Sequence, residues 1–155
     1  MAIYQALQQQ ISALERSALE AVQLKDAYQI LQSVTGIGKI LGLTIMLETG
    51  DIHRFAGAGN YASYCRCVDS KRISNGKKKG RGNAKAGNKY LSWAFSEAPH
   101  FAVRFEPLAQ RFYERKKAKT NGIVAIRAVA RKLARATWMM LKQQQPYEAK
   151  RMFPG

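Results

Sequence analysis

Apolar residues recur at helical spacing through most of this chain, and no segment alternates between apolar and polar residues as a typical strand does. The first 24 residues are rich in Gln, Ala, Leu and Glu. They place Ile3, Leu7, Leu14, Ala21 and Leu24 on one seam. This pattern predicts a helix with a weak coiled-coil seam, which would pack either on its own domain or on a partner helix.

Two further helices are predicted to meet at a turn that contains glycine. A short helix ends near Leu31, and an apolar helix extends from about Ile40 until Gly50 stops it. Between them, Gly36 and Gly38 resemble the turn of a helix-hairpin-helix, in which free backbone N–H groups hold a DNA phosphate without reading the sequence. The same turn also suits an αα-hairpin that binds no ligand.

The C-terminal half is predicted to contain three more helices. Residues 91–105 carry apolar positions at helical spacing, and Pro99 is expected to kink or split this helix. Pro107 suits the first position of the next helix, which residues 120–122 should end. A long helix follows at 123–143, and the end of the chain beyond it is expected to be loosely held. The predicted fold class is therefore all-α, a small helical domain preceded by a coiled-coil-like helix.

Residues 64–91 form a strongly basic segment that is rich in glycine and asparagine. These two residue types favour turns, so the segment is predicted to be a loop with Ser74-Asn75-Gly76 at its centre. The cations expected to bind phosphate in it, together with Lys39 beside the glycine turn, are Lys71, Arg72, Lys77, Lys78, Lys79, Arg81, Lys85 and Lys89. The alternative is a solvated loop that only keeps the protein soluble.

The predicted last helix carries a row of cations and no acidic residue. Arg127, Arg131 and Arg135 recur at every fourth position, and Lys132 and Lys142 adjoin them. Like charges at this spacing destabilise an isolated helix, so an anionic partner would explain the row.

The composition favours nucleic acid as that partner. Among 155 residues, 26 are Lys or Arg and 10 are Asp or Glu, which gives a formal net charge of +16. Phosphate neutralisation and counterion release reward such a surplus, although basic proteins also bind anionic membranes. No apolar run approaches the roughly 20 residues of a membrane span, and the first residues lack the pattern of an export signal. We therefore expect a soluble protein of the cytoplasm, with Cys65 and Cys67 reduced.

The chemistry that the sequence leaves open is attack by a hydroxyl. The acidic residues are scattered and offer no evident Mg²⁺ cluster, and no Walker pattern is present. Ser74 could attack a phosphodiester and become joined to DNA, which conserves the bond energy for religation. A serine hydroxyl needs an activating base or metal, and the candidate bases are Asp69, His53 and His100.

Three runs of the sequence together resemble a known family. Residues 34–55, 61–98 and 111–138 are very similar to the C-terminal part of bacterial insertion-sequence transposases of the IS110 family, in its IS1111 branch, which are related to pilin-gene invertases. The order of a glycine hairpin, a loop with serine before glycine and a Gly-Asn-x-Tyr-Leu helix is more specific than any one motif. The resemblance covers roughly residues 31–153.

The resemblance implies a composite active site. Family members carry an N-terminal RNase H-like domain with a metal-binding acidic tetrad, then a coiled coil, then this domain, and they are guided by a structured RNA. The family's serine corresponds to Ser74, although Asn75 stands between it and Gly76, which leaves Ser70 as an alternative. The acidic tetrad is absent from this chain, so Mg²⁺ is expected in a missing domain and no cofactor is expected in this fragment.

These inferences divide the chain into a coiled-coil remnant at 1–26, a DNA-binding and serine domain at 27–145, and a tail at 146–155. The expected partners are DNA, a structured guide RNA, the RNase H-like domain of the same transposase, and a second copy through the N-terminal helix. No membrane is expected. A nucleic-acid-binding or regulatory module without chemistry is the alternative function, and a structural basic protein of the ribosomal kind is a third.

Overall fold

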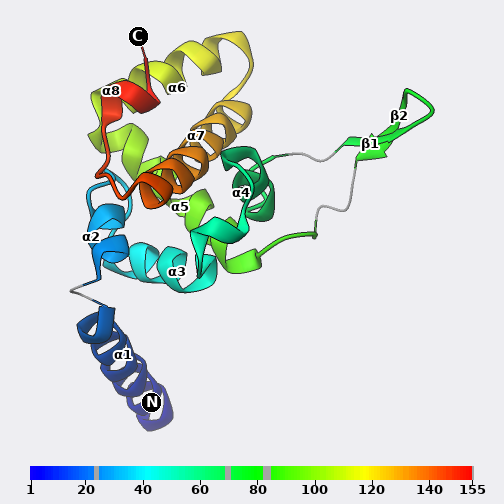
Figure 1. Ribbon diagram of the computed structural model, residues 1–155. Helices are drawn as coiled ribbons and strands as arrows, with labels where there is room; N and C mark the ends of the chain where they lie inside the picture. Colours follow the sequence, from blue (N-terminus) through cyan, green and yellow to red (C-terminus); the bar gives the residue numbers. More distant parts are fainter. Residues whose placement is uncertain (23–24, 69–70, 82–84, 155) are drawn as a thin grey trace.

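The computed structural model describes residues 1–22, 25–68, 71–81 and 85–154, with the backbone alone at 71–74 and 78–81. Figure 1 shows a helical body from which helix α1 and a β-hairpin extend. The elements in order are α1 (Ala2–Val22), α2 (Asp26–Gln32), α3 (Lys39–Thr49), the 3₁₀ turn η1 (Ile52–Arg54), α4 (Ala58–Tyr64), β1 (Lys71–Ser74), β2 (Lys77–Arg81), α5 (Lys89–Phe105), α6 (Pro107–Lys119), α7 (Gly122–Gln143) and α8 (Ala149–Met152). The all-α prediction is confirmed for the body.

Helices α5 and α7 form the centre of the body because both bury a stripe of small and apolar residues. On α5 the buried positions include Leu91, Phe95 and Ala102, which recur at helical spacing. Helix α5 packs against α3, α6 and α7, and α7 also packs against α4. Pro99 lies inside α5 without splitting it, and it is itself buried. Burial of each large apolar side chain contributes about 1.5–3 kcal/mol to this core.

Tyr61 of α4 joins three elements of the core. It is fully buried, and its hydroxyl lies 2.7 Å from Thr49 Oγ1 at the end of α3. Its ring meets Phe55 and Phe95 edge-on, at centroid distances of 5.1 and 6.3 Å. The hydrogen bond satisfies the two buried hydroxyls, which would otherwise be costly to bury. This contact fixes α4, and with it the start of the hairpin, on the body.

Polar residues cap the helices at the positions where the sequence predicts their boundaries. Asn88 Oδ1 accepts hydrogen bonds from the Tyr90 and Leu91 N–H groups at 2.8 and 2.9 Å, which starts α5. Asn121 does the same for α7 through Val124 N–H at 2.9 Å. These caps follow the Gly-Asn and Thr-Asn-Gly punctuation of the sequence.

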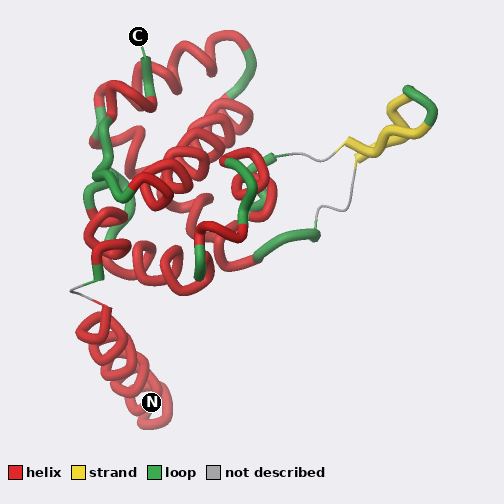
Figure 2. The backbone as a smooth tube through the Cα atoms, viewed as in Figure 1, coloured by secondary structure: helices red, strands yellow, loops and turns green. Residues whose placement is uncertain are grey.

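The basic segment forms two antiparallel strands, so the prediction of a loop without strands is wrong there (Figure 2). Ser74 pairs with Lys77 across a two-residue turn in which Asn75 has φ 52° and Gly76 has φ 71°. Positive φ at both positions defines a type I′ turn, whose twist matches that of a hairpin. Asn-Gly is the strongest short signal for this turn, but lysine-rich flanks lack the apolar alternation by which strands are recognised.

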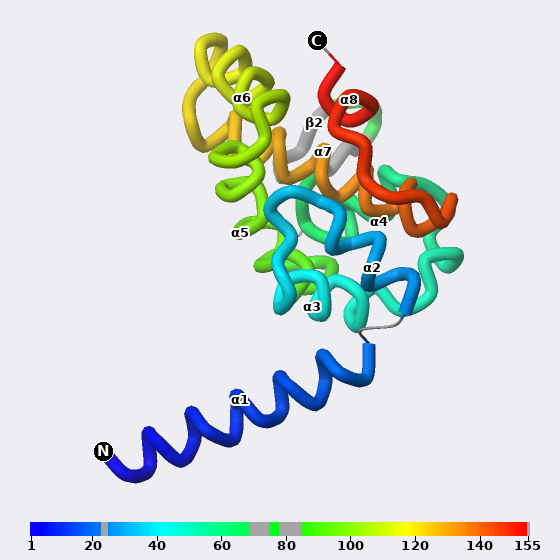
Figure 3. The backbone as a smooth tube through the Cα atoms, turned by 90° about the vertical axis from the view of Figure 1, so that its left-hand side faces the viewer, coloured from blue at the N-terminus to red at the C-terminus, as the bar shows by residue number. Residues whose placement is uncertain are grey.

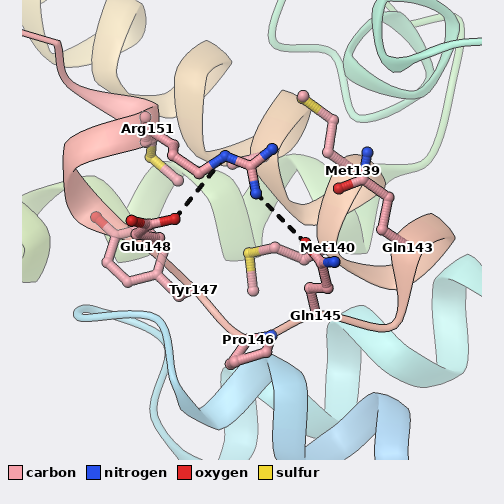
Figure 4. Close-up of a pocket in the computed structure, with 10 residues that line it drawn as sticks. Met139, Met140, Gln143, Gln145, Pro146, Tyr147, Glu148 and Arg151 are labelled. Carbon is pink, nitrogen blue, oxygen red and sulfur yellow. Dashed lines mark hydrogen bonds and ion pairs between the residues drawn. The ribbon is translucent and has the colours of Figure 1, made fainter.

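The C-terminal end packs on the body, which contradicts the expectation of a loosely held end. Met152 and Phe153 are buried, and the Phe153 ring lies 5.6 Å from the ring of Phe112 on α6. Figure 4 shows the pocket between the end of α7 and this segment, where Arg151 reaches the Glu148 carboxylate at 3.8 Å. A segment this short carries no periodic signal, so its docking could not be predicted.

Helix α1 extends away from the body as an exposed helix (Figure 3). Its C-terminal end is anchored through Val22, which packs with Tyr28 and Leu43, and Ala18 and Leu19 pack against the same cluster. Its apolar side chains stay exposed along the helix, namely Ile3, Tyr4, Leu7, Ile11 and Leu14. Among the described residues, no helix is long and apolar enough to cross a membrane.

Gly36 is held against the backbone of α5, and this contact yields a prediction about stability. It has φ 103°, and a Cβ added there would lie 2.5 Å from the Ala98 carbonyl oxygen and 2.9 Å from Ala102 N. We expect Gly36→Ala to reduce the free energy of unfolding by about 3 kcal/mol, because strain and overlap add.

Gly38→Ala is the matched control. Gly38 has φ −78°, and a Cβ added there would meet no other atom within 4 Å, so its substitution should change the free energy of unfolding by less than about 0.5 kcal/mol. Urea unfolding followed by circular dichroism measures both variants. Equal stabilities for the two would show that the contact with α5 is unimportant.

Candidate nucleic-acid interface

The hairpin places the backbone of Ser74 directly before the turn, at the end of the hairpin that points away from the body (Figure 1). Lys77 follows the turn and is exposed. The side chains of Ser74, and of the predicted phosphate-binding residues Lys71, Arg72, Lys78, Lys79 and Arg81, lie outside the described part of the chain, as does Ser70. What the hairpin does establish is that positions 71–81 are brought together on one narrow ribbon.

Close backbone contact joins the two ends of the hairpin segment at the body. Asn88 N–H donates to the Tyr64 carbonyl oxygen at 2.8 Å. Gly87 has φ 99°, and a Cβ there would collide with the same oxygen. Arg66 Nη2 crosses from the first end to the second and donates to the carbonyl oxygens of Lys85 and Gly87 at 2.6 and 3.0 Å. We call residues 64–67 and 85–88 the hairpin root.

A cavity of about 140 Å³ opens beside the hairpin root, between α5 and α7. Arg66, His100 and Arg127 line it, together with the hydroxyl-bearing residues Ser92 and Ser96, and none of the described residues that line it is acidic. The Arg66 Nε atom is buried and has no hydrogen-bond partner in the described structure. Guanidinium, imidazole and hydroxyl groups are the donors that proteins use to hold phosphate, so the cavity is suited to an anion.

From this cavity a row of exposed cations continues along α7. We call Arg127, Arg131, Arg135 and Lys142 the α7 row. Arg135 lies beside α4, since its Nη1 atom would be 3.8 Å from a Cβ atom added to Gly59 of that helix. At the far end, hydrogen bonds from His53 lower the pKa of Asp51, and the charge of Lys142 lowers it further. The row thus runs from the hairpin root to η1, over about 22 Å at 1.5 Å per residue.

Lys132 is not part of the α7 row, although the sequence analysis placed it beside the arginines of that row. Its Nζ donates to the Met152 carbonyl oxygen at 2.9 Å and lies 4.8 Å from the centre of the Phe112 ring. Burial lowers the pKa of Lys132, and the nearby charges of Arg115 and Arg135 lower it further. Lys132 therefore anchors the C-terminal end instead of facing a ligand.

The three candidate bases are placed differently. His53 lies in η1, where its ring Nδ1 is 3.0 Å from Asp51 Oδ1, at the end of the α7 row remote from the hairpin root. His100 lines the cavity beside the root. Asp69 lies outside the described residues. The structure therefore brings His100, and not His53, near the base of the hairpin.

The glycine turn is a separate surface. Gly38 and Lys39 are exposed at the start of α3, and no side chain caps this helix. Gly36 instead packs on α5, so its role in the fold is structural. Of the other predicted cations, Lys85 and Lys89 are exposed, and Lys89 Nζ lies 4.8 Å from the centre of the Tyr90 ring.

The described residues do not fit a metal ion. Within residues 1–22, 25–68, 71–81 and 85–154, no three His, Cys, Asp or Glu residues lie close enough to hold one. Hard cations such as Mg²⁺ need several oxygen ligands, which scattered carboxylates do not provide.

Comparison with known proteins decides the family. Residues 28–114, more than half of the chain, match the model of the transposase family IS116/IS110/IS902. The chain belongs to this transposase family. Over 142 residues it is 24% identical to the insertion element IS116 uncharacterized 44.8 kDa protein of Streptomyces clavuligerus, and the match covers 90% of this chain and 35% of that protein. The chain thus spans about a third of the length of this curated relative, and the resemblance to IS110 transposases is confirmed at the level of the family.

Sequence reasoning about this chain missed Arg66. This residue adopts φ 57°, which is uncommon for any residue except glycine, and its hydrogen-bond partners lie 19 and 21 residues away. No local pattern predicts such a contact. The glycine and asparagine that close the same root, Gly87 and Asn88, could be found because they belong to the Gly-Asn-x-Tyr-Leu motif.

Both cysteine thiols of the chain, Cys65 and Cys67, lie at this root and are free, as the sequence analysis predicts. Burial raises the pKa of Cys65, and it raises that of Cys67 to about 12 although the charge of Arg127 acts in the opposite direction. Thiolates are the nucleophilic and metal-binding form of cysteine. The fold therefore opposes both uses of these thiols, and the two residues serve as packing.

These raised pKa values predict how stability depends on pH. The ordinary thiol pKa is about 8.5, so protonated thiols stabilise the folded state fully below that value, and this contribution is lost as the pH rises toward about 12. Between pH 7.5 and 9.5 the two thiols together should reduce the free energy of unfolding by about 3 kcal/mol. Urea unfolding at both pH values measures the change. The variant with both cysteines replaced by alanine should lose less than about 0.5 kcal/mol, and an equal loss would contradict the assignment.

Proposed function

We propose that this chain is the part of a serine-type DNA transposase that binds nucleic acid and supplies Ser74 as the nucleophile of strand exchange. The observation that carries the proposal is the hairpin, which sets position 74 beside an Asn-Gly turn at the tip of a basic ribbon. A nucleophile at such a tip can enter a DNA groove while the body stays outside. Membership of the transposase family supports DNA as the substrate class.

The proposed reaction is exchange of one ester of phosphate for another. Ser74 Oγ would form a bond to phosphorus as the bond between phosphorus and the departing deoxyribose oxygen breaks. The hydroxyl proton would leave to a base, and the departing oxygen would gain one. Because the ester energy is kept in the Ser–phosphate bond, the reverse attack by another DNA hydroxyl can rejoin strands. The cations at positions 71–81 would stabilise the charge that grows on the phosphoryl oxygens.

The α7 row would hold the duplex during this reaction. Arg127 to Lys142 spans about 22 Å, which matches about six nucleotides at 3.4 Å each along one strand. Arginine holds phosphate with two parallel hydrogen bonds, so a row of arginines suits a phosphate backbone. The exposed start of α3, with Gly38 and Lys39, would add a phosphate contact in the manner of a helix-hairpin-helix.

Three further partners belong to the proposal. An RNase H-like acidic part of the same transposase would supply Mg²⁺, since the described residues do not fit a metal ion. Helix α1 would pair with α1 of a second copy, because Leu7, Ile11 and Leu14 lie exposed at spacings of four and three residues. A structured guide RNA would direct the complex to its DNA in the bacterial cytoplasm, at the nucleoid.

The α7 row yields a prediction about salt dependence. The Arg131→Ala and Arg135→Ala double variant should bind duplex DNA more weakly, and the slope of log K against log salt should become less steep by about 2, since each phosphate contact contributes about 0.9. Fluorescence anisotropy from 50 to 200 mM salt measures this slope. Arg16→Ala, which removes an exposed cation from α1, should leave the slope unchanged. A wild-type affinity that does not fall with salt would contradict the proposal.

The nucleophile is tested by trapping a covalent adduct. With the acidic domain supplied in trans, together with a transposon-end DNA and guide RNA, wild-type protein should form a DNA adduct that survives denaturing electrophoresis. Ser74→Ala should abolish the adduct, and Ser70→Ala should retain it. Retention in Ser74→Ala with loss in Ser70→Ala would move the nucleophile to position 70. No adduct with any variant would favour the non-catalytic binding module.

A further inference from the structure

A groove on the body exposes aromatic rings that the fold leaves uncovered. It lies where the α2–α3 turn and the first residues of α3 face the C-terminal half of α5. Ile40, Phe101 and Phe105 line it and are 37%, 46% and 63% exposed. Scattered exposed apolar residues need no explanation, but several gathered in one groove are typical of a binding surface.

Positive charge flanks these rings. Lys39 lines the groove and is exposed, and the Arg104 guanidinium lies 5.3 Å from the centre of the Phe105 ring. No acidic residue lines the groove among the residues that the structure describes. The acidic residues that belong to or follow α5 are Glu97, which is exposed one turn before Phe101, and Glu106, whose carboxylate accepts a hydrogen bond from Leu108 N–H as the cap of α6.

The spacing of the two rings suits nucleobases. Phe101 and Phe105 are four residues apart on α5, which is a rise of about 6 Å along the helix. This rise is close to twice the 3.4 Å step between stacked bases, so bases of one strand can stack on both exposed rings. Apolar side chains of a protein partner would have no need of the flanking cations.

We propose that this groove binds an unpaired segment of nucleic acid, with bases stacked on Phe101 and Phe105 and phosphates held by Lys39 and Arg104. Bases in a duplex are paired and stacked on each other and do not offer their faces, so the groove selects single strands. Its residues are different from those of the hairpin and the α7 row. The groove therefore adds a second class of nucleic-acid site to the proposed duplex-binding surface. It shares Lys39 with the duplex contact proposed at the start of α3, but Phe101 and Phe105 belong to the groove alone, so substitution of a ring tests the groove separately.

The experiment compares a labelled single-stranded oligonucleotide with a labelled duplex of the same length, by fluorescence anisotropy on the full chain. Phe105→Ala should weaken binding of the single strand at least fivefold, because stacking on one aromatic ring contributes about 1–3 kcal/mol per base. Binding of the duplex should change less than twofold. Leu47→Ala is the matched control, since Leu47 is 60% exposed on α3 and does not line the groove.

Two further variants separate stacking from a general apolar contact. Phe105→Trp should bind the single strand as well as wild type or better, whereas Phe105→Leu, which is apolar but has no ring, should lose affinity as Phe105→Ala does. A single-strand affinity unchanged in Phe105→Leu would overturn the proposal. A parallel loss of duplex binding in Phe105→Ala would also overturn it. A change in the sedimentation of the protein with Phe105→Ala would overturn it as well, because it would show that a second copy of the chain occupies the groove. Loss of duplex binding in the α7 row variants tests the proposed function independently.

Discussion

Backbone touches backbone at two points of this structure, and glycine makes both contacts possible. Gly36 brings the α2–α3 turn onto α5, and Gly87 brings the start of α5 onto the end of α4. At each point a Cβ would overlap a carbonyl oxygen of the neighbouring helix. Together they attach two basic surfaces, the exposed start of α3 and the hairpin root, to one central helix. The positions of these two surfaces therefore depend on the absence of a side chain at Gly36 and at Gly87 more than on any attractive contact.

Much of this arrangement could be predicted from local sequence signals. Gly50 ends α3, Pro107 opens α6, and Asn121 caps α7, as punctuation and helical spacing indicate. The hairpin could not, because the residues of its strands, Lys71–Ser74 and Lys77–Arg81, do not alternate between apolar and polar types. Asn75-Gly76 indicated the turn of the hairpin, but a turn signal predicts strands only when the flanking residues also favour strands.

What the sequence could not provide was the partner of each cation. Arg54 is held by the rings of Phe55 and Tyr64, at 4.3 and 4.7 Å, and it donates from Nε to the Thr49 carbonyl oxygen at 3.1 Å. Lys132 anchors the C-terminal end, and Arg66 closes the hairpin root. All three are counted in the net charge, yet each has a structural role that depends on contacts between distant parts of the chain.

The cations that remain exposed are therefore better evidence for a partner than the total charge is. Burial lowers the pKa of Lys132, and the charges of Arg115 and Arg135 lower it further. Positive residues spaced by one turn along α7 repel one another, and the described structure provides no carboxylate on that helix to offset them. A protein retains such repulsion where an anion relieves it, because neutralising a row of phosphates releases counterions that more than compensate. Under the proposed function, the arginines of α7 would weaken the free fold slightly and favour the fold bound to nucleic acid.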